Sequence, residues 1–349
     1  MKCLSRGAIL ATTASLLLLA CGEPVSSATS LSDDGPITLR LGFFPNLTHA
    51  PALVGVRLGF FAGALGSKVT LETHTFNAGP DAAAALLSDS MDAIFIGPTP
   101  TANLFAQSHG RAIRVIAGTT SGGALLVVKP SIKSVSELKG KKIADPQLGG
   151  TQDISLRWFL KNHGFASDNV GGGDVSVVPQ DNAQTLTSFK QGQIDGAWVP
   201  EPWASRLIAE GGAKVMVDER DLWPHRMFIT TNLVVSTKFL VAHPMRVKGL
   251  LEGLYQSVSY LNSNATQAQK VTTDAVKDIS GKALSDDVVS TAWSHLAFTP
   301  DPLAETLKTS ADRAHKLGLL PTVNLNGLYD LALLNEVLAE HNQARVNGL

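Results

Sequence analysis

The alternation of short apolar runs with helical segments between residues 37 and 217 is the feature that most limits the possible fold. The apolar runs have the length of strands, and segments with helical periodicity separate them. The predicted strands read ITLRLGFF, VTLETHTF, DAIFIG, IRVIAG, ALLVVK, KKIAD, VSVVP, IDGAWV and KVMVD. This order implies right-handed βαβ crossovers, so we predict an α/β fold with mainly parallel sheets flanked by helices.

A repeated unit indicates two lobes. DAIFIGPTP and DGAWVPEP each place an aspartate before a strand, prolines after it and a helix on either side. Two similar α/β lobes explain such a repeat better than one domain does. We predict crossovers near residues 119–123 and 230–232, with lobe 1 formed by 37–121 plus 232–349 and lobe 2 by 122–231. After the strand LVVST we predict a helical C-terminal region with helices at 244–263, 265–279, 285–295, 302–317 and 327–341.

The first residues are typical of a secretion signal. Lys2 and Arg6 precede an apolar stretch that is too short to span a bilayer, and Leu-Leu-Ala stands directly before Cys21. This arrangement resembles the lipobox of bacterial lipoproteins, with an ordinary secreted protein as the alternative. We therefore predict a signal peptide at residues 1–20, lipidation of Cys21 and a flexible tether at 21–36. The protein would then be anchored to a membrane outside the cytoplasm, in the periplasm or on the outer face of the cell.

Composition removes several function classes. The chain has 29 Lys and Arg against 30 Asp and Glu, which argues against a basic surface for nucleic acid. Of its 2 cysteines, Cys3 would leave with the signal and Cys21 would be acylated, so disulfides, thiolate metal sites and a cysteine nucleophile are excluded. Metalloprotease, serine hydrolase and P-loop motifs are absent from the sequence, and its 9 histidines lack ligand spacing. We predict a protein that is not an enzyme and uses neither a cofactor nor a metal.

Five loops at predicted strand ends are the candidate binding region, because ligands of open α/β sheets bind where strands lead into helix N-termini. Each loop offers hydroxyls, amides or backbone N–H groups, and none contains Lys or Arg: 45–49, 97–100, 119–122, 148–153 and 200–203. Converging helix N-termini can hold a small anion without a cationic side chain. Alternatively, Thr48, Thr99 and Thr151 only cap their helices. The set of five favours a cleft.

Single residues in these loops keep two interpretations each. His49 could donate to an anion or only hold the local turn. Trp198 and Trp203 could form an aromatic wall or belong to the core, where each indole N–H would need a partner. Glu201 is more typical of a first-turn helix charge than of an acid catalyst.

Longer segments carry a family resemblance from about residue 37 to the C-terminus. LRLGFFPNLTHAPALVG, DAIFIGPTP, IAGTTSGGALLVV, LKGKKIADPQLGGTQD, DNAQTLTSFKQGQIDGAWVPEPWA and the helical tail resemble substrate-binding lipoproteins of ABC importers for nitrate, sulfonate and taurine. The resemblance implies a type II periplasmic-binding-protein fold, whose two lobes close over a small anionic solute by a hinge motion. It also implies a monomer that delivers its ligand to a permease in the cytoplasmic membrane.

The resemblance also implies a set of ligand-binding positions: Asn46, Thr48, His49, Gly97, Thr99, Thr120, Ser121, Gly150, Thr151, Gln152, Asp153, Trp198, Glu201 and Trp203. Alkanesulfonate binders often carry serines where this chain has Gln152 and Asp153. A carboxylate facing the cleft would repel a bare sulfonate but would accept a hydrogen bond from an ammonium group or from bicarbonate. On this basis Asp153→Asn should alter selectivity more than stability.

The sequence leaves four functions open. An organosulfonate or taurine-like ligand comes first, and nitrate or bicarbonate second. FFPNLTHA also resembles proteins for the pyrimidine precursor of thiamine, some of which are enzymes on the same fold, and His49 would be the reactive group in that case. A surface lipoprotein that senses a ligand without feeding a permease is the fourth.

Overall fold

The structure is a computed structural model that describes residues 35 to 349. The predicted signal peptide and Cys21 lie outside the described residues, as does all of the predicted tether except residues 35 and 36. The described residues belong to one compact unit. Within them, no helix combines the length and the apolar character that crossing a membrane requires.

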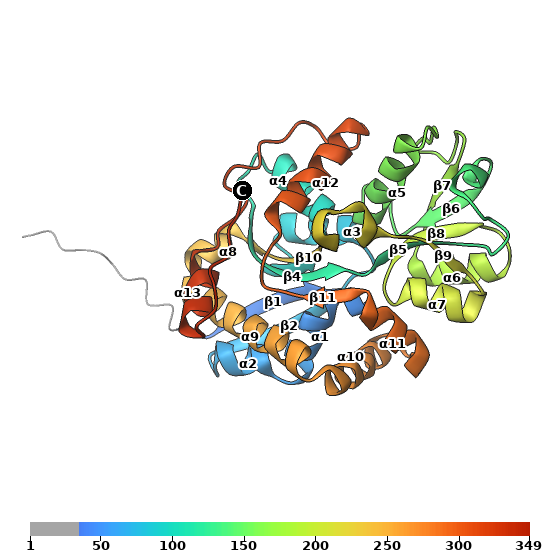
Figure 1. The fold of residues 1–349 in the computed structure, drawn as a ribbon. Coiled ribbons are helices and arrows are strands. Elements are labelled where there is room, and N and C mark those ends of the chain that lie inside the picture. The colour runs from blue at the N-terminus through green and yellow to red at the C-terminus, as the bar shows by residue number, and fades with distance from the viewer. Residues whose placement is uncertain (1–34) are drawn as a thin grey trace, which may run out of the picture. The chain divides into compact units, whose positions relative to one another are not determined.

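Two sheets build the two lobes (Figure 1). The six-stranded sheet of lobe 1 has the order β11-β4-β10-β3-β1-β2. Its strands are β1 (Ile37–Phe43), β2 (Val69–Thr75), β3 (Ala93–Ile96), β4 (Ile113–Gly122), β10 (Ile229–Ser236) and β11 (Leu296–Phe298). The five-stranded sheet of lobe 2 has the order β7-β6-β8-β5-β9. Its strands are β5 (Ala124–Val128), β6 (Lys142–Asp145), β7 (Ser176–Pro179), β8 (Gly196–Pro200) and β9 (Lys214–Asp218).

The predicted α/β fold with two lobes is confirmed, but each sheet is mixed rather than mainly parallel. β1 pairs in parallel with β2 and β3, and β6 pairs in parallel with β7 and β8. Antiparallel pairs join β10 to β3 and β4, β11 to β4, and β5 to β8 and β9. The antiparallel pairs follow from the connections between the lobes. β4 passes into β5 without a helical crossover, and β10 returns to lobe 1 from lobe 2. Neither connection is a βαβ unit, which would bring the chain back into the same sheet as a parallel strand.

The passage from β4 to β5 depends on two glycines. Gly122 and Gly123 have φ of 77° and 74°, a left-handed conformation that suits glycine. A Cβ at Gly122 would also lie 2.5 Å from the carbonyl oxygen of His295. β4 and β10 pair along their length up to this passage and are therefore both longer than predicted. The other predicted strands are present close to their expected ends.

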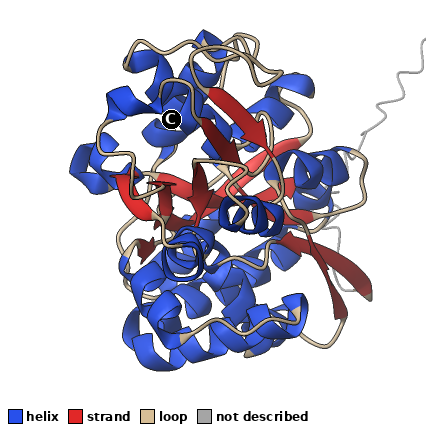
Figure 2. Cartoon of the chain, turned by 90° about the vertical axis from the view of Figure 1, so that its right-hand side faces the viewer, coloured by secondary structure: helices blue, strands red, loops and turns tan. Residues whose placement is uncertain are grey.

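Helices cover both faces of the lobe 1 sheet (Figures 1 and 2). One face packs against α1 (Ala50–Arg57), α2 (Phe60–Leu65), α9 (Pro244–Ser263), α10 (Ala265–Ser280) and α13 (Ala332–Glu340). The other face packs against α3 (Gly79–Leu87), α4 (Pro98–Gln107) and α12 (Ala304–Lys316). Each face buries its own apolar cluster, so the sheet is a rigid platform for the loops at its strand ends.

The lobe 2 sheet is covered in the same way. One face packs against α5 (Thr151–Asn162), and the other packs against α6 (Asn182–Lys190) and α7 (Trp203–Gly211). The remaining helices are α8 (Thr237–Ala242) and α11 (Asp286–Ser294), with short 3-10 turns η1 (Leu47–His49), η2 (Val135–Leu138), η3 (Glu219–Leu222) and η4 (Pro224–Arg226). The predicted C-terminal helices are all present, although α13 begins later than predicted.

Candidate functional site

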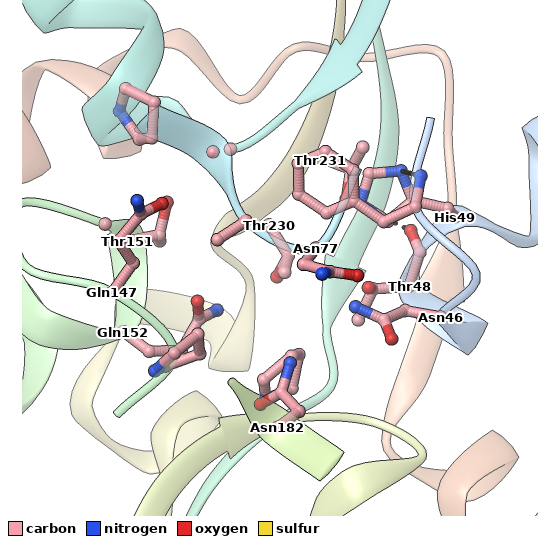
Figure 3. A pocket seen from close by; sticks show the side chains of 18 residues that line it. Asn46, Thr48, His49, Asn77, Gln147, Thr151, Gln152, Asn182, Thr230 and Thr231 are labelled. Carbon is pink, nitrogen blue, oxygen red and sulfur yellow. Dashed lines mark hydrogen bonds between the residues drawn. The ribbon is translucent and has the colours of Figure 1, made fainter. Parts of the chain in front are cut away.

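A small cavity lies where strand-end loops of the two lobes face each other (Figure 3). Its volume is about 40 Å³. A cavity needs about 10–15 Å³ of such space to hold one water molecule, so this one suits a compact ligand or a compact head group. Its lining residues are Phe44, Asn46, Thr48, His49, Asn77, Ala78, Gly79, Gly97, Pro100, Pro146, Gln147, Gly150, Thr151, Gln152, Asn182, Pro200, Thr230 and Thr231. We call this the head cavity; none of its lining residues is Lys, Arg, Asp or Glu.

Helix N-termini surround the head cavity. The N-cap or first residue of each of five helices, α1, α3, α4, α5 and α6, lines it. None of these five helices has a side-chain cap bond at its N-cap. The N–H groups of a first helical turn have no partner within the helix, and the helix dipole adds positive potential there. The cavity therefore presents positive potential and hydrogen-bond donors without a formal charge.

Unpaired polar atoms in the lining favour a polar ligand. Oγ1 of Thr151, Oε1 of Gln147 and Oδ1 of Asn182 are buried without a hydrogen-bond partner, and all three residues line the cavity. In Figure 3, Gln147, Thr151 and Gln152 face Asn46, Thr48 and Thr230 across one space. Because a buried polar group without a partner costs about 1–3 kcal/mol, a bound molecule that pairs with these atoms is favoured.

His49 reaches the head cavity as a neutral side chain. It is buried, stacks on Phe44 with ring centroids 4.3 Å apart, and its Nδ1 accepts a bond from the Phe44 backbone N–H at 3.4 Å. Burial lowers the pKa of His49 to about 3. An accepting Nδ1 places the proton of the neutral ring on Nε2, so His49 is a hydrogen-bond donor with no charge of its own.

The two lobes are in contact around the cavity, so the cleft is closed. Nε1 of Trp203 donates to Oδ1 of Asn46 at 2.9 Å, and Nε2 of Gln147 donates to Oδ1 of Asp81 at 3.0 Å. The backbone N–H of Leu47 donates to the carbonyl of Glu201 at 3.1 Å. The lobes also approach closely at Gly97: a Cβ there would lie 2.3 Å from Oγ1 of Thr151 in the other lobe.

Asp153 does not face the cavity, which corrects the sequence-based expectation. Its side chain is fully buried; Oδ1 accepts from Nε of Arg157 at 2.6 Å and Oδ2 from the backbone N–H of Gly149 at 2.8 Å. Asp145 is buried beside this pair, and burial, with the neighbouring charge of Asp153, raises its pKa well above the usual range. A charge can be buried here because a guanidinium accompanies it. Asp153 therefore holds the loop that precedes α5 rather than contacting a ligand.

Trp198, Glu201 and Trp203 also lie outside the head cavity. Trp198 is a fully buried core residue whose Nε1 donates to Oε2 of Glu219 at 2.7 Å. The carboxylate of Glu201 accepts from the backbone N–H and the hydroxyl of Ser205 and lies 2.7 Å from Nδ1 of His295. Trp203 lines a neighbouring cavity instead. These aromatic and acidic residues within and after β8 thus serve the lobe 2 core and the contact with lobe 1.

Three further predicted residues, Thr99 in the first turn of α4 and Thr120 and Ser121 near the end of β4, are not in the lining. Thr99 and Thr120 are buried, and Oγ1 of each has no partner. The hydroxyl of Ser121 accepts from the backbone N–H of Phe228 at 3.2 Å, which ties β4 to the return of the chain into lobe 1. The predicted residues that the structure does bring together in the head cavity are Asn46, Thr48, His49, Gly97, Gly150, Thr151 and Gln152.

The sequence-based prediction missed much of the lining. Asn77 follows β2 and Asn182 follows β7, so the rule used for the other strand ends would have found both. Gln147 stands one residue before a loop that was identified. Thr230 and Thr231 lie on β10, and their role follows only from the return crossover. Among residues 35 to 349, no group of three or more His, Cys, Asp or Glu is placed to hold a metal ion.

Comparisons with known proteins agree with this arrangement. The chain is 28% identical to the taurine-binding periplasmic protein of Escherichia coli (strain K12), over 52% of this chain and 54% of that protein. It is 24% identical to a bicarbonate-binding protein of Synechococcus sp., over 74% of this chain and 64% of that protein. The fold matches the alkanesulfonate-binding protein of Xanthomonas axonopodis pv. citri bound to MOPS, with a TM-score of 0.70, 22% identity, and coverage of 85% of this chain and 99% of that one.

The family model for the NMT1-like family matches residues 33–275, which is more than half of the chain. The match covers both sheets except β11 and includes every residue that lines the head cavity. This chain belongs to the NMT1-like family.

Proposed function

We propose that this protein is the extracytoplasmic solute-binding component of an ABC importer. It captures a small oxyanion, such as an aliphatic sulfonate or a taurine-like compound, and delivers it to a permease in the membrane. The observation that carries the proposal is the head cavity, in which helix N-termini of both lobes and the unpaired hydroxyl of Thr151 meet without a formally charged lining residue. Taurine, sulfonate and bicarbonate binding by the similar proteins supports the same ligand class.

In this proposal the ligand-binding residues are the predicted residues of the head cavity together with Asn77, Gln147 and Asn182. The lobes are 37–121 plus 232–349 and 122–231, and they open for ligand entry by bending at the two crossovers. Lipidation of Cys21 tethers a monomeric receptor beside its permease. The protein binds and releases its ligand without turnover.

The proposal is tested by thermal unfolding of the purified protein with a panel of small molecules. The panel contains 2-aminoethanesulfonate, 2-hydroxyethanesulfonate, ethanesulfonate, nitrate, bicarbonate and a pyrimidine. A ligand that binds only the closed native state adds RT ln(1 + [L]/Kd) to the free energy of unfolding, about 2.7 kcal/mol at 100 times Kd. A rise in melting temperature with at least one oxyanion is expected. No response from any anion contradicts the proposal.

A second candidate ligand is a planar oxyanion, nitrate or bicarbonate. The volume of the head cavity, about 40 Å³, favours it, because a ligand of this size needs no space beyond the head group. It is distinguished in the same panel: planar oxyanions then stabilise the protein and sulfonates do not. The pyrimidine in the panel tests the alternative that the protein binds a pyrimidine precursor.

His49 is expected to act as a neutral donor to the bound anion. His49→Gln keeps an N–H close to the position of Nε2, so it should retain most of the affinity, whereas His49→Ala should lose about 1.5–3 kcal/mol of binding free energy, the range for a bond to a charged group. Isothermal titration at pH 7 measures both. Equal affinities for His49→Ala and the unaltered protein would exclude His49 from the binding site and from any chemistry.

The lowered pKa of His49 also predicts how the free energy of unfolding depends on pH. The pKa of His49 is about 3 in the folded protein and near 6.5 in the unfolded chain. The contribution of the neutral ring to the free energy of unfolding is therefore complete above pH 6.5 and is lost as the pH falls towards 3. The loss can reach about 1.4 kcal/mol per pH unit. Denaturant unfolding of His49→Gln between pH 7 and 4 should show a shallower acid decline than the unaltered protein. Parallel curves would contradict a neutral buried His49.

A further inference from the structure

A contact between α12 of lobe 1 and α5 of lobe 2 joins the lobes outside the head cavity (Figure 1). Ile154 of α5 is buried in the apolar cluster that lobe 1 forms with α4 and α12. Further along the two helices, Nζ of Lys161 donates to the backbone carbonyl of Lys316 at 2.8 Å. Any opening of the cleft that separates α5 from α12 therefore breaks contacts in which the ligand takes no part.

Arg313 of α12 makes the most specific part of this contact. Its guanidinium lies 4.1 Å from the centroid of the Trp223 ring and 5.9 Å from that of the Trp158 ring. Nζ of Lys316 lies 5.7 Å from the same Trp158 ring. A cation within about 6 Å of the centroid of an aromatic ring is attracted by the electron-rich face of the ring. Because both tryptophans belong to lobe 2, Arg313 places a positive charge of lobe 1 over two aromatic rings of the other lobe.

The lobe 2 side of this contact is organised around a buried acidic residue. Oε2 of Glu219 accepts from Nε1 of Trp198 at 2.7 Å, and Oε1 accepts from Oγ of Ser155 at 2.6 Å. Oε1 also accepts from Nε1 of Trp223 at 3.4 Å. The Trp223 ring stacks on Phe228, with ring centroids 5.5 Å apart. All these partners belong to lobe 2, so the position of the Trp223 ring is fixed independently of α12.

Glu219 and Arg313 also interact through their charges. Burial raises the pKa of Glu219, whereas its three hydrogen-bond donors and the charge of Arg313 lower it. Burial lowers the pKa of Arg313, and the charge of Glu219 opposes that shift. Each charge therefore stabilises the other across the boundary between the lobes. Neither residue lines the head cavity.

We propose that Arg313 stabilises the closed arrangement of the lobes from outside the head cavity and thereby sets the overall affinity for ligand. When only part of a protein population is in the binding-competent state, the apparent affinity is reduced by that fraction. A contact that favours closure raises the fraction for every ligand alike. Arg313 is then a positioning residue that changes the strength of binding and not the choice of ligand. This inference rests on the proposed function, because it takes ligand binding in the closed cleft as its starting point.

The test is a substitution that keeps a long side chain and removes its charge. 2-Aminoethanesulfonate, ethanesulfonate, nitrate and bicarbonate are titrated by calorimetry at pH 7 into the unaltered full chain and into Arg313→Met. The variant should bind every anion that the unaltered protein binds roughly 3- to 30-fold more weakly, the range for a partly buried cation–π contact. The ratios between the affinities should stay the same. Arg313→Lys keeps a cation over the rings and should recover much of the loss.

Lys308→Met is the matched control on the same helix. The side chain of Lys308 is 53% exposed, and its ion-pair partner Glu305 also belongs to α12, so the affinities should not change.

Unchanged affinity in Arg313→Met overturns the inference and leaves the proposed function intact. A loss that Lys308→Met reproduces, or that Arg313→Lys does not reduce, also overturns it. A loss confined to one of several bound anions has the same consequence, because it would indicate a local effect on the head cavity. If the unaltered protein binds no anion, the proposed function fails, and the inference fails with it.

Discussion

Gly97→Ala is expected to weaken ligand binding by roughly 5- to 150-fold, the range that 1–3 kcal/mol of overpacking produces. A Cβ at Gly97 would lie 2.3 Å from Oγ1 and 3.3 Å from Cβ of Thr151. The two residues belong to different lobes, so the added methyl group clashes only when the cleft is closed. Calorimetric titration with whichever oxyanion raises the melting temperature measures the loss.

The same substitution should leave the folded protein nearly as stable as before in the absence of ligand. Gly97 has φ of −71° and ψ of 162°, a conformation that alanine adopts without strain. Opening the cleft moves Thr151 away, so the cost appears in the binding step and not in folding. Denaturant unfolding without ligand is the measurement that separates the two.

Gly63→Ala is the matched control for Gly97→Ala. Gly63 lies in α2, and a Cβ there meets no heavy atom within 4 Å, so the variant should bind as the unaltered protein does. Unchanged affinity in Gly97→Ala would mean that the lobes do not approach each other at this point when ligand is bound. That result would contradict the role of the head cavity as a closed binding site.

Arg157→Met should lower the free energy of unfolding by about 3–5 kcal/mol, the usual cost of removing one partner of a buried ion pair. Arg157 and Asp153 have side-chain exposures of 2% and 0%, and the atoms Nε and Oδ1 are 2.6 Å apart. Without the guanidinium, Asp153 keeps a buried charge that is stabilised only by hydrogen bonds, such as the one from the Gly149 N–H, and by no opposite charge. Burial raises the pKa of the neighbouring Asp145, but a carboxyl group cannot supply the positive charge that Arg157 provides.

An exposed pair with the same spacing provides the comparison. Lys270→Met breaks the bond between Nζ of Lys270 and Asp274, whose side chains are 77% and 38% exposed, and should cost no more than about 0.5 kcal/mol. Chemical denaturation measures both variants at the same pH. Similar small losses for Arg157→Met and Lys270→Met would refute the importance of the buried pair.

The buried position of Asp153 also changes the expected effect of Asp153→Asn on ligand selectivity. From the sequence it was expected to alter selectivity more than stability, and the structure reverses this order. The carboxylate contacts Arg157 and the loop before α5 and does not line the head cavity. We expect lower stability and an unchanged ratio of the affinities for 2-aminoethanesulfonate and 2-hydroxyethanesulfonate.

Much of the architecture was predictable because it follows from local rules. Strands and helices have different hydrophobic periods, and these periods placed the strands and the C-terminal helices close to their observed positions. The rule that ligands bind at strand ends also led to the loops around Thr48, Gly97 and Thr151, which line the head cavity. One local signal was overlooked: Asp153 and Arg157 are four residues apart on one helix, a spacing that favours an ion pair.

The remaining features depend on contacts between distant parts of the chain. Trp198 lies near the end of a strand, Glu201 follows it, and Asp153 lies in the first turn of a helix, as several lining residues do, so their sequence positions alone could not separate them from binding residues. The direction of each side chain depends on a hydrogen-bond partner elsewhere in the chain. This partner is Glu219 for Trp198, and for Glu201 it is His295, 94 residues away.

The hydrophobic periods of the sequence were therefore sufficient to predict the α/β lobes and the uncharged loops at their strand ends. Only the packing of the lobes against each other decided which of those loops enclose a cavity and which polar groups remain unpaired inside it. The physical reason is that backbone preference and amphipathic pattern act within a few turns or one strand. The burial of a polar or charged side chain depends on whether a partner arrives from another part of the fold.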